Sequence, residues 1–220
     1  MSSHRLAGLV AIGLLIAGTA SALPAAAPAV GSNLLGVQLT DGMADLYGYS
    51  GSNLISAYDH SELGVGLQLW HFMTSDYAMA FSAGYGFFSE TDQPGNNAPA
   101  GMPDFKYTQS SYSVRVGGDR VLNLGSATRI YLGPGVEYWS GKAKFDTGVA
   151  STTFETQDVT RLSLSSRLGA MMKLNENLSF SCQVGHKLGH ATASDKGRKA
   201  TWWPSSFDGA CGLVFALGGH

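Results

Sequence analysis

Residues 77–88 read Tyr-Ala-Met-Ala-Phe-Ser-Ala-Gly-Tyr-Gly-Phe-Phe, with the large apolar side chains at every second position. From Ala78 to Gly86 the intervening positions hold only alanine, serine and glycine. Successive side chains of a β-strand point to opposite faces of the sheet. The segment therefore predicts a strand with one large apolar face and one face of small residues.

The same period of two recurs along the chain from Asn33 onward, and it predicts eight strands. The predicted strands are 33–40, 63–71, 77–88, 111–117, 129–138, 162–172, 178–188 and 207–217. Short connections at 74–76, 123–128 and 175–177 alternate with long connections at 41–61, 89–109, 141–160 and 191–205. One hairpin and one long loop thus repeat about every 50 residues, as expected of an up-and-down sheet.

The composition restricts the environment of this sheet. Only 14% of the 220 residues are charged, whereas an average soluble domain has about 25%. The surface of a soluble domain needs roughly 25–35% charged residues, so much of this surface must face something other than water. The net charge of −2 also argues against a nucleic-acid partner, because such proteins are usually basic.

The N-terminal segment predicts export. His4 and Arg5 precede an apolar stretch at 6–18, and Ala20-Ser21-Ala22 forms a small-residue cleavage site. We expect residues 1–22 to be a signal peptide cleaved near Ala22, since a membrane-spanning anchor needs about 20 apolar residues. Residues 23–32 are then an Ala/Pro-rich periplasmic tether, and 33–220 form the barrel domain.

Short turns at one end and long loops at the other are typical of outer-membrane barrels. A soluble barrel would place lysine and glutamate on its polar face, whereas here that face is mostly glycine, serine and alanine. Small residues suit a narrow lumen that side chains must fill. We therefore predict an all-β, eight-stranded antiparallel up-and-down transmembrane β-barrel with its large apolar residues toward lipid.

The strand count, the loop asymmetry and the final strand, GACGLVFALGGH, resemble those of small outer-membrane barrels of the OmpA transmembrane-domain and OmpX type. The resemblance implies a monomer in the outer membrane of a Gram-negative bacterium, with no cofactor and a structural or surface-interaction role. The implied partners are membrane lipid, lipopolysaccharide and the outer-membrane assembly machinery. Such barrels commonly end on an aromatic residue that this machinery recognises, so here the recognised end is expected to be internal, around Phe215.

Five charged residues in the lumen phase are expected at similar heights on consecutive strands: Arg115, Glu137, Arg167, Lys187 and Asp208. Charges in so narrow a lumen must be paired. The sequence therefore predicts a crossed ion-pair network that closes the lumen. The alternative is a selective path that makes the protein a narrow ion or solute pore.

The only two cysteines, Cys182 and Cys211, lie on neighbouring predicted strands in the same outward phase. Two interpretations stay open. They are either two small apolar side chains facing lipid or a cross-strand disulfide, which the export compartment permits.

The last long loop combines three cations with two aromatic residues: Lys196, Arg198, Lys199, Trp202 and Trp203. Aromatic and basic residues commonly anchor a protein at the membrane interface. A second hypothesis is contact with lipopolysaccharide phosphates or with a surface partner.

An enzymatic alternative comes from a second resemblance. The segment Gly189-His190-Ala191-Thr192 and the later Asp208 are similar in outline to the catalytic residues of lipid A deacylases of the PagL type. However, His190 and Thr192 occupy the lipid-facing phase and Asp208 the lumen phase, whereas a triad requires contact. We therefore predict a protein that is not an enzyme. No metal site is expected either, because His186 and His190 would lie about 13 Å apart on a strand.

Overall fold

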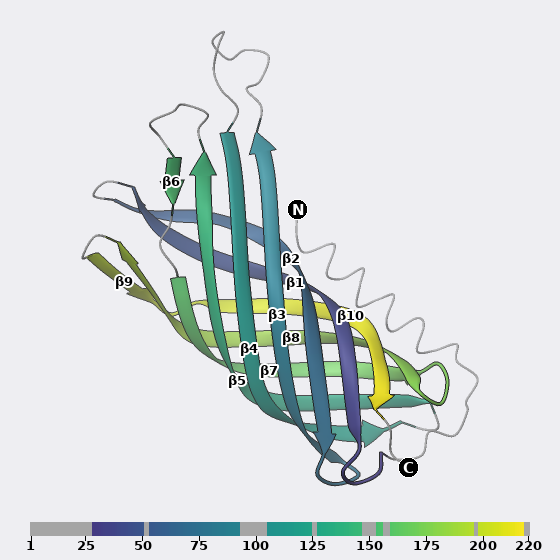
Figure 1. The fold of residues 1–220 in the computed structure, drawn as a ribbon. Coiled ribbons are helices and arrows are strands. Elements are labelled where there is room, and N and C mark those ends of the chain that lie inside the picture. Colours follow the sequence, from purple (N-terminus) through teal and green to yellow (C-terminus); the bar gives the residue numbers. More distant parts are fainter. Residues whose placement is uncertain are drawn as a thin grey trace.

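The computed structural model describes residues 28–50, 53–92, 105–124, 127–146, 153–155, 159–195 and 198–217. Antiparallel strands make up almost all of this part of the chain (Figure 1). Eight strands are long: β1 (Asn33–Ser50), β2 (Asn53–Phe72), β3 (Tyr77–Asp92), β4 (Phe105–Asn123), β5 (Thr128–Asp146), β7 (Val159–Lys173), β8 (Leu178–Asp195) and β10 (Ser205–Leu217). Two are short: β6 (Thr153–Glu155) and β9 (Arg198–Trp202).

The eight long strands close into a barrel. Each pairs with its neighbour in chain order, while β10 pairs with β8 on one side and with β1 on the other. The short strands stand outside this ring, β6 on β5 and β9 on β8. The predicted all-β, eight-stranded antiparallel fold is confirmed. Among the described residues there is no helix long and apolar enough to cross a membrane.

The closed section of the barrel has the length needed to span a bilayer. β1 and β10 pair from Asn33 with Leu217 to Gly42 with Asp208, over ten positions. β2 and β3 pair over ten positions as well. A tilted strand crosses the hydrocarbon core in about 9–11 residues.

The prediction of a long loop at 41–61 is wrong, because most of this segment is strand. β1 and β2 remain paired beyond the barrel up to Ser50 with Asn53, with a bulge opposite Ala44–Leu46. Beyond Gly42 neither strand pairs with its barrel neighbour among the described residues, so 43–50 and 53–61 form a two-stranded projection of their own. The alternation of apolar and small residues is lost there because neither face of the hairpin must contact lipid or the lumen. The backbone pairing nevertheless continues.

The other predicted long loops are also partly strand. β3 and β4 stay paired to Asp92 with Phe105, and β4 and β5 to Lys106 with Asp146. β8 and β9 form another projecting hairpin up to Asp195 with Arg198. We refer to these projections, together with 43–61, as the outer hairpins (Figure 1).

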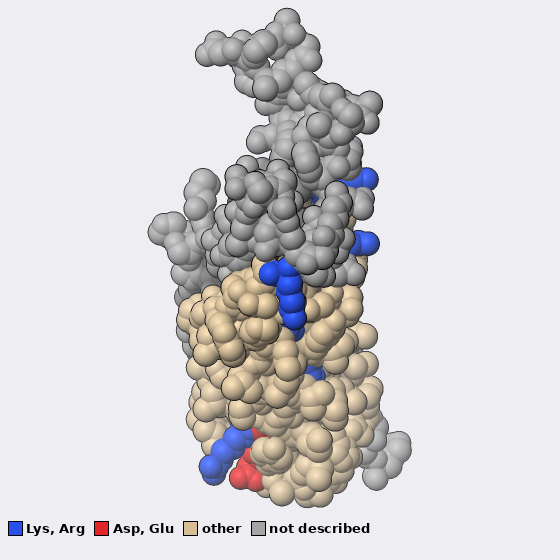
Figure 2. All heavy atoms as spheres, turned by 90° about the vertical axis from the view of Figure 1, so that its left-hand side faces the viewer, with Lys and Arg blue, Asp and Glu red and all other residues tan. Residues whose placement is uncertain are grey.

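The barrel wall is apolar on its outside, as the sequence predicts. Its outward positions carry exposed leucine, valine, phenylalanine and tyrosine side chains, among which Leu164 is 71% exposed. Met172 is an exception on this phase, because only 7% of it is exposed. On the side seen in Figure 2 most of the described barrel surface is uncharged, and exposed charges lie mainly toward its ends.

Cys182 and Cys211 form a disulfide between β8 and β10. The two residues are direct register partners, and their Cα atoms lie 4.2 Å apart. The bridge therefore joins two strands of the barrel whose connection passes through β9.

Just before β1, the backbone N–H of Gly31 donates to the carbonyl oxygen of Phe72 at the end of β2. The last residues of the segment predicted as a tether thus contact the barrel. The predicted signal peptide, residues 1–22, lies outside the described residues.

Candidate functional site

The lumen is filled by apolar side chains at the end where the short turns lie. The buried cluster contains Leu34, Trp70, Phe72, Ala78, Ala80, Val121, Tyr131, Met171 and Val214. All of these residues belong to the inward phase of their strands and lie near the short-turn ends of those strands. This apolar cluster closes the short-turn end of the lumen.

A buried ion pair borders the apolar cluster. Arg167 on β7 donates from Nε to Oδ1 of Asp119 on β4 at 3.0 Å, and its Nη2 contacts Oδ2. The indole Nε1 of Trp70 donates to the same Oδ2 at 2.8 Å. The guanidinium also lies 5.6 Å from the ring centre of Trp70 and 5.7 Å from that of Tyr131. Charge-assisted hydrogen bonds and two cation–π contacts thus offset the burial of both charges.

Neutral polar side chains continue across the lumen from this pair. The hydroxyl of Tyr131 lies 2.9 Å from that of Ser181 and donates to Oε1 of Gln183 at 3.1 Å. Gln183 in turn donates to Gln38 at 3.4 Å. In the amide orientation that satisfies both neighbours, Gln68 donates to Gln38 and accepts from Arg167.

A second group of charges lies nearer the outer hairpins. Nζ of Lys187 is 2.7 Å from Oε1 of Glu137 and 3.1 Å from Oδ2 of Asp208. Arg161 approaches the same Glu137 oxygen at 3.7 Å, and its guanidinium lies 5.2 Å from the ring centre of Trp139. Ion pairs therefore connect β5, β7, β8 and β10 across this part of the lumen.

The five residues predicted to form one ion-pair network do not all contact one another. It brings Glu137, Lys187 and Asp208 together, but Arg167 pairs with Asp119. Arg115 is held by neutral groups, Ser165 and the carbonyl oxygen of Gly133. The predicted height of each residue rests on counting along its own strand. Neighbouring strands of a closed barrel are staggered relative to one another, so such counts do not give the true heights.

Sequence reasoning missed Asp119 and Trp70, and both had a usable signal. Asp119 follows Arg115 in the same inward phase of β4, and Trp70 continues the inward phase of β2. Asp119 lies one alternation beyond the predicted strand 111–117, whereas Trp70 already lies in the inward phase of the predicted strand 63–71. Arg161, one residue before the predicted strand 162–172, also lies in the inward phase of β7 and is buried.

A cavity of about 110 Å³ lies inside the lumen. One wall consists of small residues from β2, β3 and β4, including Gly66, Ser82, Gly84 and Ser113. The charged residues that line the cavity are Arg115, Glu137, Arg161, Arg167, Lys187 and Asp208, and of these Arg115 lies on β4 together with Ser113. The space is large enough for a few water molecules or one small ion.

The residues of the hydrolase hypothesis are not assembled. Asp208 pairs with Lys187 inside the lumen, whereas His190 is exposed outside and contacts Trp203, ring centre to ring centre, at 5.3 Å. In the register Asp208 lies opposite Gly185, five residues from His190 and therefore about 17 Å along the strand. Thr192 follows His190 on the outer face, also away from Asp208. These three residues do not form a triad.

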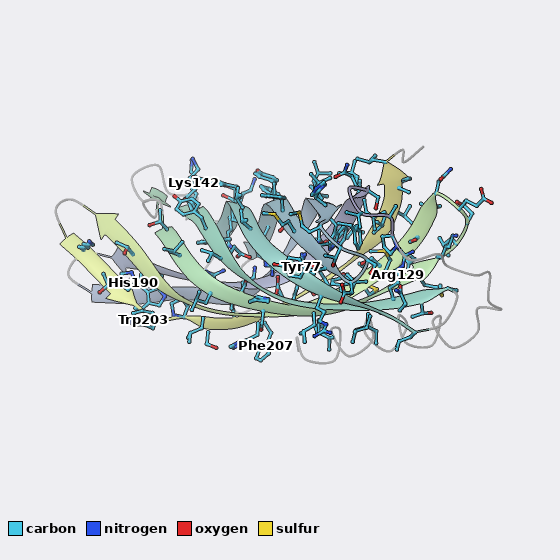
Figure 3. The ribbon with its side chains drawn as sticks, turned by 90° about the horizontal axis from the view of Figure 1, so that it is seen from below. Tyr77, Arg129, Lys142, His190, Trp203 and Phe207 are labelled. Atoms are coloured by element: carbon cyan, nitrogen blue, oxygen red, sulfur yellow. A yellow bond between two sulfur atoms is a disulfide. The ribbon has the colours of Figure 1, made fainter. Side chains whose placement is uncertain are left out.

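The predicted headgroup-contact residues are only partly described. Lys199 and Trp203 are exposed, and Trp202 is half-buried beside Ala191. Figure 3 shows Trp203 and His190 together near β9, at the opposite end of the barrel from Arg129. Lys196 and the side chain of Arg198 lie outside the described residues.

His186 makes protein contacts rather than facing a second metal ligand. Its Nε2 lies 2.9 Å from the Ser205 hydroxyl, and its ring packs against Phe207, which points away from the barrel in Figure 3. In the part of the chain with described side chains, no three His, Cys, Asp or Glu residues cluster as metal ligands would.

Comparison with known proteins agrees with this architecture. The family model for the outer membrane protein beta-barrel domain matches residues 12–201. The chain belongs to this family. No curated protein sequence matches it.

Several solved structures are similar to this chain. A de novo designed transmembrane beta-barrel has a TM-score of 0.48 at 11% identity, covering 87% of this chain and 100% of its own. The outer membrane protein OprG from Pseudomonas aeruginosa has a TM-score of 0.47 at 16% identity, covering 86% and 97%. Ail, the attachment invasion locus protein of Yersinia pestis, has a TM-score of 0.42 at 14% identity, covering 84% and 97%.

Membership of the outer-membrane barrel family indicates an outer-membrane location. The exposed leucine, valine and aromatic side chains of the wall are then the lipid-contacting surface. The charges of the lumen are separated from lipid by the barrel wall.

Proposed function

We propose that the protein is a closed outer-membrane barrel with a structural or surface-interaction role carried by its outer hairpins. The observation that carries this proposal is the filling of the lumen. The apolar cluster occupies its short-turn end, and the Asp119–Arg167 pair lies across it. A barrel of eight strands has an interior that side chains can fill.

The outer hairpins are the second support. Residues 43–50 and 53–61 leave the barrel as two paired strands, and each has an edge that pairs with no third strand in the described part of the chain. Such edges can accept a strand from a partner. Export by a signal peptide cleaved near Ala22 would place the short turns in the periplasm and the hairpins outside.

Planar-bilayer recording tests the closed lumen. We expect the refolded protein, as a monomer, to show no stable large conductance. The double variant Trp70→Ala, Phe72→Ala removes two of the three largest side chains of the apolar cluster, so it serves as the opened control. Stable large conductance of the unmodified protein would overturn the proposal in favour of a pore.

A lipopolysaccharide-binding assay tests the surface role. Replacing Lys196, Arg198 and Lys199 by alanine is expected to weaken binding, because in the sequence Lys196 follows β8 and the other two cations begin β9. Arg120→Ala is the matched control, since Arg120 is exposed on β4 toward the short-turn end. Equal binding by all three proteins would exclude lipopolysaccharide as the partner of this hairpin.

Lipid A analysis tests the enzymatic alternative. We expect unchanged acylation on expression of either the natural chain or His190→Ala, because His190 contacts Trp203 and not Asp208. Loss of an ester-linked acyl chain that disappears in His190→Ala would establish a hydrolase.

A further inference from the structure

Arg120 on β4 is a cation on the lipid-contacting wall of the barrel. It is exposed, belongs to the outward phase and lies near the end of β4 that leads into a short turn. Its register partners are Tyr77 on β3, 45% exposed, and Leu132 on β5, 55% exposed. Leu122, the next outward residue of β4, is exposed as well. The guanidinium group therefore belongs to a part of the wall made of side chains that contact lipid.

No carboxylate forms an ion pair with Arg120 within the described structure. Asp119, the preceding residue, points into the lumen and pairs with Arg167. Asp76, in the turn before β3, accepts a hydrogen bond from the Thr74 hydroxyl at 2.7 Å. An arginine stays charged in proteins, and a charge among apolar groups is costly without a partner. A counter-charge for Arg120 can therefore come from the membrane that surrounds this end of the wall.

Polar residues on neighbouring strands show that the apolar wall ends at this level. The outward residues Asn33 on β1 and His71 on β2 are register partners, and Nδ1 of His71 lies 2.9 Å from Oδ1 of Asn33. His71 is also paired with Met79 on β3, one outward position from Tyr77. Tyrosine and polar side chains at the end of an apolar band are typical of the boundary between hydrocarbon and headgroups. Arg120 can therefore place its charge at headgroup level.

Gly118 is the second unusual feature of this wall. It occupies the outward phase of β4 between Val116 and Arg120, where a large apolar side chain would suit lipid. A Cβ atom at Gly118 would overlap the Tyr77 hydroxyl and lie 2.8 Å from Cζ of the ring, so the tyrosine lies across this glycine. Because β4 runs toward the short turns, Gly118 is about 6–7 Å farther from them along the strand than Arg120. The hydroxyl of Tyr77 makes no hydrogen bond within the described structure.

We propose that Arg120 and Tyr77 form a binding site for one glycerophospholipid of the leaflet at the short-turn end. Such a lipid carries its phosphate at the membrane surface and its ester carbonyl groups deeper, next to the acyl chains. The guanidinium of Arg120 binds the phosphate, and the Tyr77 hydroxyl donates to an ester carbonyl oxygen. Gly118 gives the site its shape, because it lets the tyrosine lie along the wall. The site does not depend on the proposed surface role, which concerns the other end of the barrel.

Native mass spectrometry of the refolded protein tests the site with defined lipids. The unmodified protein should hold one phosphatidylglycerol molecule saturably. Diacylglycerol with the same chains lacks the phosphate and should not be retained. Diether phosphatidylglycerol lacks the ester carbonyls and should bind about two- to tenfold more weakly, as expected for the loss of one hydrogen bond. Equal retention of the three lipids, or displacement of phosphatidylglycerol by inorganic phosphate alone, would overturn the proposal. These comparisons do not depend on whether a variant folds.

Variants assign the binding to its residues. Arg120→Ala should weaken phosphatidylglycerol binding by about tenfold or more, since it removes a hydrogen bond between charged groups. Lys173→Ala is the matched control, because it removes a cation at the same end of the barrel from the inward phase of β7. Tyr77→Phe should bind the ester and diether lipids equally, and Gly118→Ala should do the same by displacing the ring. Tyr85→Phe, on the outward face farther along β3, should keep the preference for the ester.

The lipopolysaccharide assay separates this site from the surface role. Arg120→Ala should lose phosphatidylglycerol and keep lipopolysaccharide, whereas the variant in Lys196, Arg198 and Lys199 should show the reverse. An ester preference that persists in Tyr77→Phe, or an equal loss of phosphatidylglycerol in Arg120→Ala and Lys173→Ala, would contradict the site.

Discussion

Asp119 and Arg167 form a two-point ion pair across the lumen, between β4 and β7, two strands that are not neighbours. Asp119 has no exposed surface, and it also accepts a hydrogen bond from Trp70. Gly133, on the intervening strand β5, leaves the room that the pair needs, because a Cβ there would meet Asp119. The pair therefore joins two strands that β5 separates, next to the apolar cluster of the lumen.

Asp119→Asn should destabilise the barrel by about 3–5 kcal/mol, because it leaves the guanidinium of Arg167 buried without its counter-charge. Urea unfolding of the refolded protein in detergent measures this loss. Glu176→Gln, in the exposed turn at 174–177, is the matched control and should change stability by less than about 0.5 kcal/mol.

The double variant Asp119→Leu, Arg167→Met tests whether the stability lost in Asp119→Asn comes from the unpaired charge or from lost packing. Replacing both partners by apolar groups should recover most of the stability that Asp119→Asn loses. A loss below about 1 kcal/mol in Asp119→Asn would show that the pair does not hold the walls together.

Gly169→Ala tests whether the lumen glycines make room for large inward side chains. A Cβ at Gly169 would overlap the Tyr131 ring, whose Cε2 would be 2.6 Å away. Overpacking of this kind costs about 1–3 kcal/mol, measured again by urea unfolding. Gly66→Ala is the control, because its nearest contact would be 3.4 Å and it borders the cavity. An equal cost at both positions would contradict this role of Gly169.

The fold could be predicted from the sequence because lipid and lumen impose opposite demands on alternate residues. From Tyr77 to Phe87 the exposed wall residues are apolar and, apart from Ala83, large, while the inward ones are alanine, serine and glycine. Every transmembrane strand must satisfy both demands, so the alternation of residues identifies each strand that crosses the membrane.

The outer hairpins could not be found in the same way. From Met43 to Ser61 the strands have no lipid-facing side, so pairing depends on backbone hydrogen bonds that leave little trace in residue type. The resulting stretch has the composition of a loop, and sequence reasoning treats it as one.

The lumen contacts were only partly predictable. The inward phase identifies Glu137, Lys187 and Asp208, but the choice of partner depends on how far each side chain reaches across the barrel. Arg167 reaches Asp119 because small residues on β5, between the two strands, leave the path open. No pattern within one strand contains that information.

Leu164→Arg tests the lipid-facing wall. Leu164 is the outward residue near the middle of β7 and is 71% exposed. An arginine on the lipid face near the bilayer midplane costs about 2–4 kcal/mol, falling to about 0–1 kcal/mol at the interface. Leu174→Arg, in the turn after β7, is the matched control. Equal stability of both variants in lipid vesicles would show that β7 does not cross the hydrocarbon core at Leu164.

The disulfide between Cys182 and Cys211 predicts both a thiol count and a stability difference. Titration of the denatured, unreduced protein should detect no free thiol, because the two cysteines are the only ones in the chain. Cross-linking positions 29 residues apart restricts the unfolded chain, which in the chain-entropy account is worth about 3–4 kcal/mol. The double variant Cys182→Ala, Cys211→Ala should lose this amount in urea unfolding.

The unmodified protein, reduced while unfolded and then refolded with reductant, is the control for that comparison. It should match the double variant in stability, since both lack the bridge while only one lacks the sulfur atoms. Two titratable thiols in the unreduced protein would instead show that Cys182 and Cys211 stand side by side on the outer wall without a bond.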